Sequence, residues 1–222
     1  MGVEAVGVEV VAVRVGEGLG VEAVRLLEQA IQVQEVLDPD DKAKRYDLLL
    51  ALADALGPAG DPLGVIEQVA PEAFKLAEAL NDGVRASHAS LAALHGFQRY
   101  ANGSLMTSPE FAEWAKRADR YVAPGTKERV ITDYMLSGIE MFSGRMGEAR
   151  RITEQAMATA RKLDDPETLF TIAFPMIHRE WAPQHMRESF ELAREFAAHP
   201  RKSVRPATLV PALLACAIVH LE

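Results

Sequence analysis

The chain has 222 residues, of which 49% are apolar and 25% are charged, and its formal net charge is −8. This acidic balance argues against direct nucleic-acid binding, which needs a basic surface to displace counterions. No apolar run reaches the roughly 20 residues that a membrane-spanning helix needs. We therefore expect a cytoplasmic protein with no membrane contact.

Residues 1–16 fit two structures. Val6, Val8 and Val10 alternate as in a strand, and β-branched residues disfavour a helix. Val3, Val6 and Val10 nevertheless also lie at helical spacing. The helical repeat in the rest of the chain requires a first helix here, so we favour the helix and keep the strand as the alternative.

The following segments have apolar residues at helical spacing, separated by turn and capping residues. Pro71 removes an amide donor and predicts a kink or break near Val69, and Pro175 predicts another interruption. The last helix has no partner, which favours a fragment of a longer protein. The predicted helices cover residues 21–37, 42–56, 62–80, 83–101, 109–122, 127–143, 146–163, 166–178, 184–199 and 206–220.

A repeat organises these helices. Residues 18–30 resemble residues 144–156, and glycines expected in turns recur 41 to 43 residues apart at Gly18, Gly60, Gly103 and Gly144. A period in this range, filled with helical signals, is typical of stacked helix pairs. We therefore predict an all-α right-handed superhelix of about five helix pairs plus a terminal helix, with residues 1–222 forming a single solenoid.

Two segments carry a family resemblance. Residues 22–30 (EAVRLLEQA) and 49–56 (LLALADAL), the latter followed by Ala59-Gly60-Asp61, resemble tetratricopeptide-like (TPR-like) repeats. They are most similar to the degenerate repeats of large bacterial LuxR-type ATP-dependent transcription regulators and cyclase-linked signalling ATPases. The resemblance implies a helical array that binds an inducer or a protein partner. The period near 42 departs from the usual 34, and no phosphate-binding G-x-x-x-x-G-K-[ST] motif is present.

Alignment with the tetratricopeptide pattern assigns small residues to the contacts between paired helices, where they allow close approach. These residues are Ala53, Gly96 and Ser137 in first helices and Ala23, Ala112 and Ala149 in second helices. The same alignment sends five larger side chains toward the concave side, namely Phe97, Tyr100, Tyr134, Met141 and Phe142. Concave surfaces of repeat arrays bind partners, but apolar residues at this spacing are also typical of an ordinary core.

The histidines do not predict a metal site. His88 and His95 are seven residues apart, whereas a helical metal pair prefers i, i+4 spacing together with a third ligand. His178, Glu180 and His185 could form a carboxylate–histidine site, but Pro183 interrupts the chain between them. The single cysteine, Cys216, lies in an apolar run and is expected to be buried. We therefore predict no metal, no cofactor and no enzymatic activity.

The predicted function is recognition. The leading hypothesis is a protein-interaction or effector-sensing module of a bacterial signalling or transcription regulator, with a protein, peptide or small effector as partner. The alternative is a small-molecule-binding helical domain with an enclosed apolar pocket. A homodimer through the terminal helix is a further hypothesis, because this helix has an apolar face made of Leu209, Leu213, Leu214 and Ile218.

Overall fold

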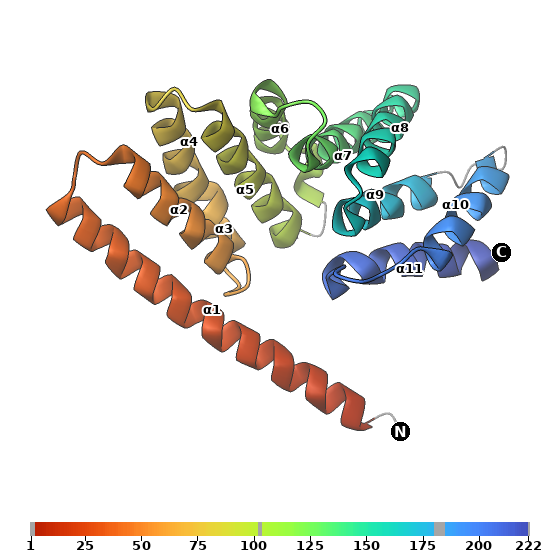
Figure 1. Cartoon of the computed structure of the whole chain (residues 1–222), viewed down its shortest axis with the longest axis horizontal. Helices are drawn as coiled ribbons and strands as arrows, with labels where there is room; N and C mark the ends of the chain where they lie inside the picture. Colours follow the sequence, from red (N-terminus) through yellow and green to blue (C-terminus); the bar gives the residue numbers. More distant parts are fainter. Residues whose placement is uncertain (1–2, 102–103, 180–184, 222) are drawn as a thin grey trace. The chain divides into compact units, whose positions relative to one another are not determined.

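The computed structural model describes residues 3–101, 104–179 and 185–221. Every regular element within these ranges is a helix, and they contain no strand, which confirms the all-α class. The chain divides into two compact units, Met1–Tyr121 and Val122–Glu222. Among the described helices, none combines the length and the apolar character that crossing a membrane would need. Figure 1 shows the helices in chain order.

The first unit consists mainly of antiparallel helices packed against their neighbours in sequence, with α1 on α2, α4 on α5 and α5 on α6. Residues 62–79 form one continuous helical segment of three parts. The elements are α1 (Val3–Leu37), α2 (Lys42–Leu56), α3 (Pro62–Gly64), the π-helical turn η1 (Val65–Val69), α4 (Ala70–Ala79), α5 (Gly83–Ala101), the 3-10 turn η2 (Ser104–Thr107) and α6 (Pro109–Tyr121).

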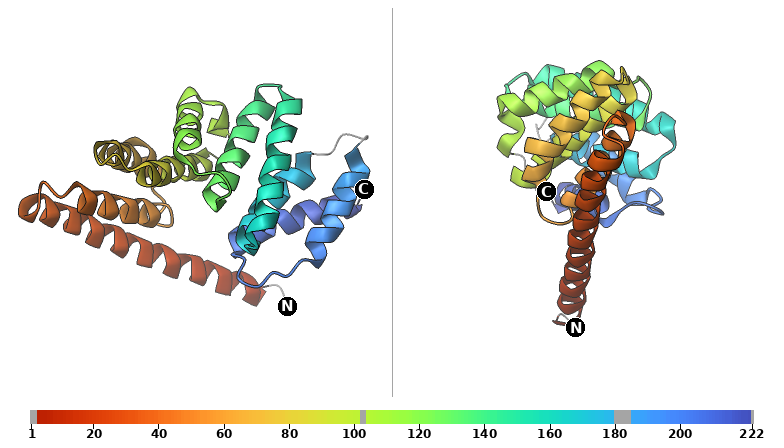
Figure 2. Two further views of the ribbon diagram at one scale, coloured as in Figure 1. Left: turned by 45° about the horizontal axis from the view of Figure 1, so that its top comes forward. Right: turned by 90° about the vertical axis from the view of Figure 1, so that its left-hand side faces the viewer.

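The structure of α1 contradicts one prediction and agrees with another. Residues 3–16 are helical, as favoured, but the turn expected at Gly18 is wrong because α1 continues for 35 residues. A glycine inside a helix costs only about 1 kcal/mol relative to alanine. Gly20 also lets α1 approach the chain after α2, since a Cβ there would lie 3.2 Å from the amide nitrogen of Ala59. Toward its N-terminus, α1 extends past the end of α2 (Figures 1 and 2).

The kink or break expected near Val69 takes the form of the π-helical turn η1. Its last bond runs from the Ala70 amide to the carbonyl of Val65, five residues back. Proline clashes with the carbonyl four residues before it, here that of Glu67. Widening the turn moves that carbonyl away from Pro71, and the helix continues without a break.

The core of the first unit combines alanines with a few aromatic rings. Buried alanines on α4, α5 and α6 allow these helices to approach closely. Phe74 and Trp114 meet edge to face with ring centroids 5.7 Å apart, and the guanidinium of Arg117 lies 4.5 Å from the Trp114 centroid. Of the six small residues predicted at helix contacts, Ala53, Gly96, Ser137 and Ala149 are buried, and Ala23 and Ala112 are half-buried.

The second unit is formed by α7 (Lys127–Phe142), α8 (Met146–Leu163), α9 (Pro166–Arg179), α10 (Met186–Ala198) and α11 (Pro206–Leu221). Two expectations are wrong here. Helix α9 passes Pro175 without interruption, and it packs on α7, α8, α10 and α11. Helix α11 does have partners, since it packs on α9 and α10. Its Leu214 is exposed, and a dimer through this helix stays a prediction.

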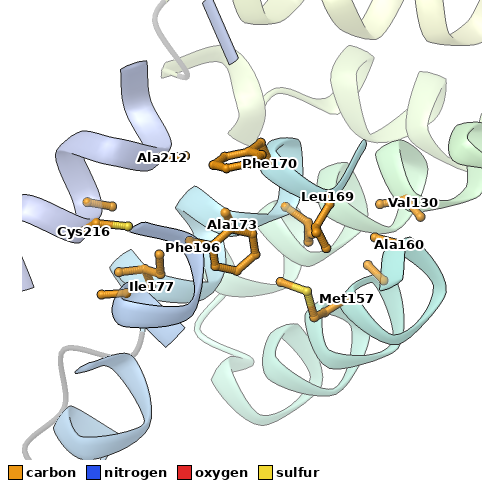
Figure 3. Packing of buried hydrophobic residues seen from close by; sticks show 14 residues of the cluster. Val130, Met157, Ala160, Leu169, Phe170, Ala173, Ile177, Phe196, Ala212 and Cys216 are labelled. Carbon is orange, nitrogen blue, oxygen red and sulfur yellow. The ribbon is translucent and has the colours of Figure 1, made fainter. Parts of the chain in front are cut away.

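A cluster around Phe170 forms the core of the second unit (Figure 3). Phe170 is fully buried, and its ring lies edge to face with that of Phe196 at 5.5 Å. Helix α8 contributes Met157 and Ala160, and α11 contributes Ala212 and Cys216. Side chains from α7 to α11 thus share one apolar interior.

Two of the predicted turn glycines adopt the left-handed backbone that favours glycine. Gly60 has φ +87° and Gly144 has φ +78°, whereas Gly103 lies outside the described residues. Gly144→Ala is expected to destabilise by about 1–2 kcal/mol, because a Cβ strains this conformation. Gly147→Ala, inside α8 with open space around it, should stabilise by about 0.5–1 kcal/mol. Urea denaturation of both variants tests this contrast, and equal effects would contradict it.

Candidate functional site

The five predicted site residues lie in different environments and in both units. Phe97 is only 5% exposed and packs edge to face on Phe111 at 5.8 Å, so it belongs to the core of the first unit. Tyr100, one turn further along α5, is 50% exposed. Tyr134 and Met141 are half-buried on α7, where Tyr134 packs against the Phe170 cluster. Phe142, at the end of α7, is exposed.

Tyr100 lines a pocket of the first unit. This pocket has a volume of about 490 Å³ and opens to solvent. It lies between the turn after α2, the start of α3 and the C-terminal end of α5. We call it the Arg99 pocket, and its lining residues are Gly57, Gly60, Asp61, Pro62, Leu63, Arg99 and Tyr100.

One wall of the Arg99 pocket is a turn that backbone and side-chain hydrogen bonds stabilise. Helix α2 ends with the amide of Asp61 donating to the carbonyl of Leu56 at 3.0 Å, across Gly60 in its left-handed conformation. The Asp61 carboxylate then accepts from the amide of Gly64 at 2.9 Å and caps the next helix. These hydrogen bonds restrict the conformation of the turn, which forms one side of the pocket.

The opposite wall carries Arg99, in the last turn of α5. Its side chain lies over Gly57, where a Cβ would be 3.3 Å from the guanidinium Nε. Among the residues that the structure describes, no acidic side chain forms an ion pair with Arg99. Arg85, on the same helix, differs in this respect because it pairs with both Asp47 and Asp82. A guanidinium offers forked donors that match a carboxylate or phosphate. The pocket therefore has the Asp61 carboxylate on one wall and a guanidinium on the other, and an anionic group would bind on the Arg99 side.

Tyr100 adds an apolar surface with a polar tip beside this charge. Half of the residue is exposed, and Pro62 and Leu63 line the same pocket. Exposed tyrosines contribute large contact areas at low entropic cost, and their hydroxyl groups donate and accept hydrogen bonds. The arrangement suits a ligand that carries an anionic group next to an apolar or aromatic one.

The histidines and the cysteine lie elsewhere. His88 is half-buried and His95 is exposed, and the described residues contain no group of three or more potential ligands arranged for a metal ion. The Arg150 guanidinium lies 2.7 Å from the His185 ring and 3.0 Å from Glu188. The side chain of His178 and all of Glu180 lie outside the described residues. Burial raises the pKa of the Cys216 thiol, which disfavours the reactive thiolate.

Sequence reasoning identified Tyr100 but missed the charged half of the pocket. It predicted the turn at residues 57–60 correctly, yet nothing in the sequence shows that Arg99 lies over Gly57. A partial signal was available, since a basic residue next to an exposed aromatic ends α5 without a nearby acidic residue in sequence. Comparison of the chain with protein-family models, with curated proteins and with solved structures gives no match.

Proposed function

We propose that the chain is a TPR-like helical array and acts as a non-catalytic recognition module. Five helices begin about 40 residues apart, namely α2, α5, α7, α9 and α11. Each of the first four is followed by a second helical segment before the next one begins. This regular alternation supports the repeat. The resemblance to large bacterial regulators supports a place in a signalling or transcription regulator, where such an array binds a partner or an effector.

The Arg99 pocket carries the proposal. Its open shape admits a segment of a larger molecule, and its Arg99 guanidinium has no acidic partner among the described residues. Tyr100, Pro62 and Leu63 supply an apolar surface next to that charge. We therefore take the ligand to be an extended protein segment in which an acidic residue lies next to an apolar or aromatic residue.

A small apolar effector in an enclosed pocket has less support. Asp61 and Arg99 place two charged side chains in the wall of the Arg99 pocket, and the pocket opens to solvent. Sites for small apolar ligands are usually enclosed and lined mainly by apolar side chains. The geometry of the first unit thus favours the peptide over the effector.

Selection from a random peptide library on the immobilised chain tests the proposal. Peptides enriched on the wild type but not on Arg99→Glu are expected to contain Asp or Glu beside an apolar residue. By fluorescence anisotropy, Arg99→Glu should weaken such a peptide at least about tenfold. A hydrogen bond to a charged group contributes about 1.5–3 kcal/mol, and about 1.4 kcal/mol corresponds to a factor of ten.

Arg187→Glu is the matched control. Arg187 has a side chain that is 91% exposed on α10, and its replacement changes the net charge by the same amount. Affinity within about twofold of the wild type is expected for this variant, because Arg187 lies in the other unit and its exposed pair with Glu191 contributes little. Equal losses in both variants would mean that binding depends on overall charge, and unchanged affinity in Arg99→Glu would place the binding site elsewhere.

A further inference from the structure

Helix α5 and the segment that begins at Pro62 both line the Arg99 pocket. They meet at Gly96, one turn before Arg99 and Tyr100 on α5. Gly96 is buried, and a Cβ there would lie 2.9 Å from Cγ1 of Ile66 and 3.2 Å from the carbonyl oxygen of Pro62. Real Cβ atoms essentially never lie closer than 3.0 Å to such neighbours. The α5 backbone at Gly96 therefore lies too close to the segment that begins at Pro62 for a Cβ to fit without a shift.

The other side of this contact is made by the π-helical turn. Ile66 lies inside η1, and Pro62 lies one turn before it. A π-helical bond spans one residue more than an α-helical bond. Each residue turns an α-helix by about 100°, so an α-helical turn in place of η1 would rotate residues 62–64 by about that angle relative to α4. Val65 and Val69 are both buried in the present arrangement. The π turn thus lets the helix bury these two valines while Pro62 and Leu63 face the pocket.

We propose that Gly96 and the π turn together set the width of the Arg99 pocket, so that Gly96 is a positioning residue for the ligand. Gly96 does not line the pocket. Gly96 acts by setting how far Pro62 and Leu63, on one side of the pocket, lie from Arg99 and Tyr100 on the other side. The effect on ligand affinity rests on the proposed function, whereas the effect on the empty pocket does not.

Gly96→Ala tests this role in the unliganded protein first. The added methyl group must displace Ile66 or Pro62, so the methyl resonances of Leu63 and the ring resonances of Tyr100 are expected to shift. Gly147→Ala, with open space around the added methyl, is the control and should leave these resonances unchanged. Unchanged Leu63 and Tyr100 resonances in Gly96→Ala would overturn the positioning role.

Affinity for the acidic peptide selected on the wild type is the second measurement. Gly96→Ala should weaken it about 3- to 10-fold, because a site held a few tenths of an ångström too wide loses contacts on both walls. The double variant Gly96→Ala/Ile66→Ala removes the closest atom and should restore affinity to within about threefold of the wild type. This variant also keeps the test valid if Gly96→Ala alone does not fold.

The outcomes separate the two proposals. If no selected peptide depends on Arg99, the proposed function fails, while the resonance shifts still decide whether Gly96 sets the pocket width. If Arg99 is required but Gly96→Ala binds the peptide as the wild type does, the positioning role fails and the proposed function stands. Failure of the double variant to recover affinity would also contradict the contact between Gly96 and Ile66 as the cause.

Discussion

Phe170→Ala is expected to lower the free energy of unfolding by about 3–5 kcal/mol, the usual cost of removing a buried aromatic ring. Phe170 is fully buried and meets the rings of Phe196 and His199 at centroid distances of 5.5 and 5.9 Å. Its neighbours come from helices before and after α9 (Figure 3). Removal of the ring leaves a cavity that several helices would have to move to fill.

Urea denaturation followed by circular dichroism measures this loss in the second unit. Phe142→Ala is the matched control, because Phe142 lies in the same unit but is 53% exposed. It should cost less than about 1 kcal/mol, since exposed substitutions have small effects. Similar losses in the two variants would contradict the position of Phe170 at the centre of this core.

Asp133→Ala is also expected to cost about 3–5 kcal/mol, because it takes a carboxylate away from a largely buried positive charge. Arg129 and Asp133 lie one turn apart on α7, with Nε and Oδ1 separated by 2.8 Å. Their side chains are only 15% and 7% exposed. The loss therefore includes the cost of keeping the Arg129 guanidinium desolvated without the Asp133 carboxylate.

Two variants define the origin of that loss. Glu154→Ala removes a carboxylate from a pair with the same i, i+4 spacing on α8, but this pair is much more exposed, so the cost should stay below about 1 kcal/mol. Arg129→Met/Asp133→Leu replaces both charges by apolar groups and should recover most of the stability lost in Asp133→Ala. A double variant as unstable as Asp133→Ala would contradict the desolvation argument.

Helix positions were largely predictable because apolar spacing, prolines and capping residues act locally. Ser108, for example, caps α6 by accepting from the amide of Phe111 at 3.1 Å. Gly18 shows the limit of such signals. Gly144 ends a helix and Gly18 lies inside one, and similar sequences around the two glycines do not distinguish these cases. The difference depends on whether a following segment reverses and packs.

The pocket was predictable only in part, because several other helices pack against different sides of α5. Which α5 side chains stay exposed therefore depends on where those helices lie. Phe97 and Tyr100 are three residues apart, and the sequence pattern sends both toward the same surface. In the structure, α6 covers Phe97, and Tyr100 lies beyond that contact. The position of Arg99 depends on the approach of the turn after α2, which is a tertiary contact. Sequence periodicity carries no information about such contacts.

A reciprocal charge exchange between Arg99 and the selected peptide tests the recognition proposal most directly. The acidic residue of the peptide is changed to Lys, and both peptides are measured against the wild type and Arg99→Glu. We expect the Lys peptide to bind Arg99→Glu at least about tenfold more tightly than it binds the wild type, because opposite charges are again paired. A Lys peptide that binds both proteins equally would contradict a direct contact with Arg99.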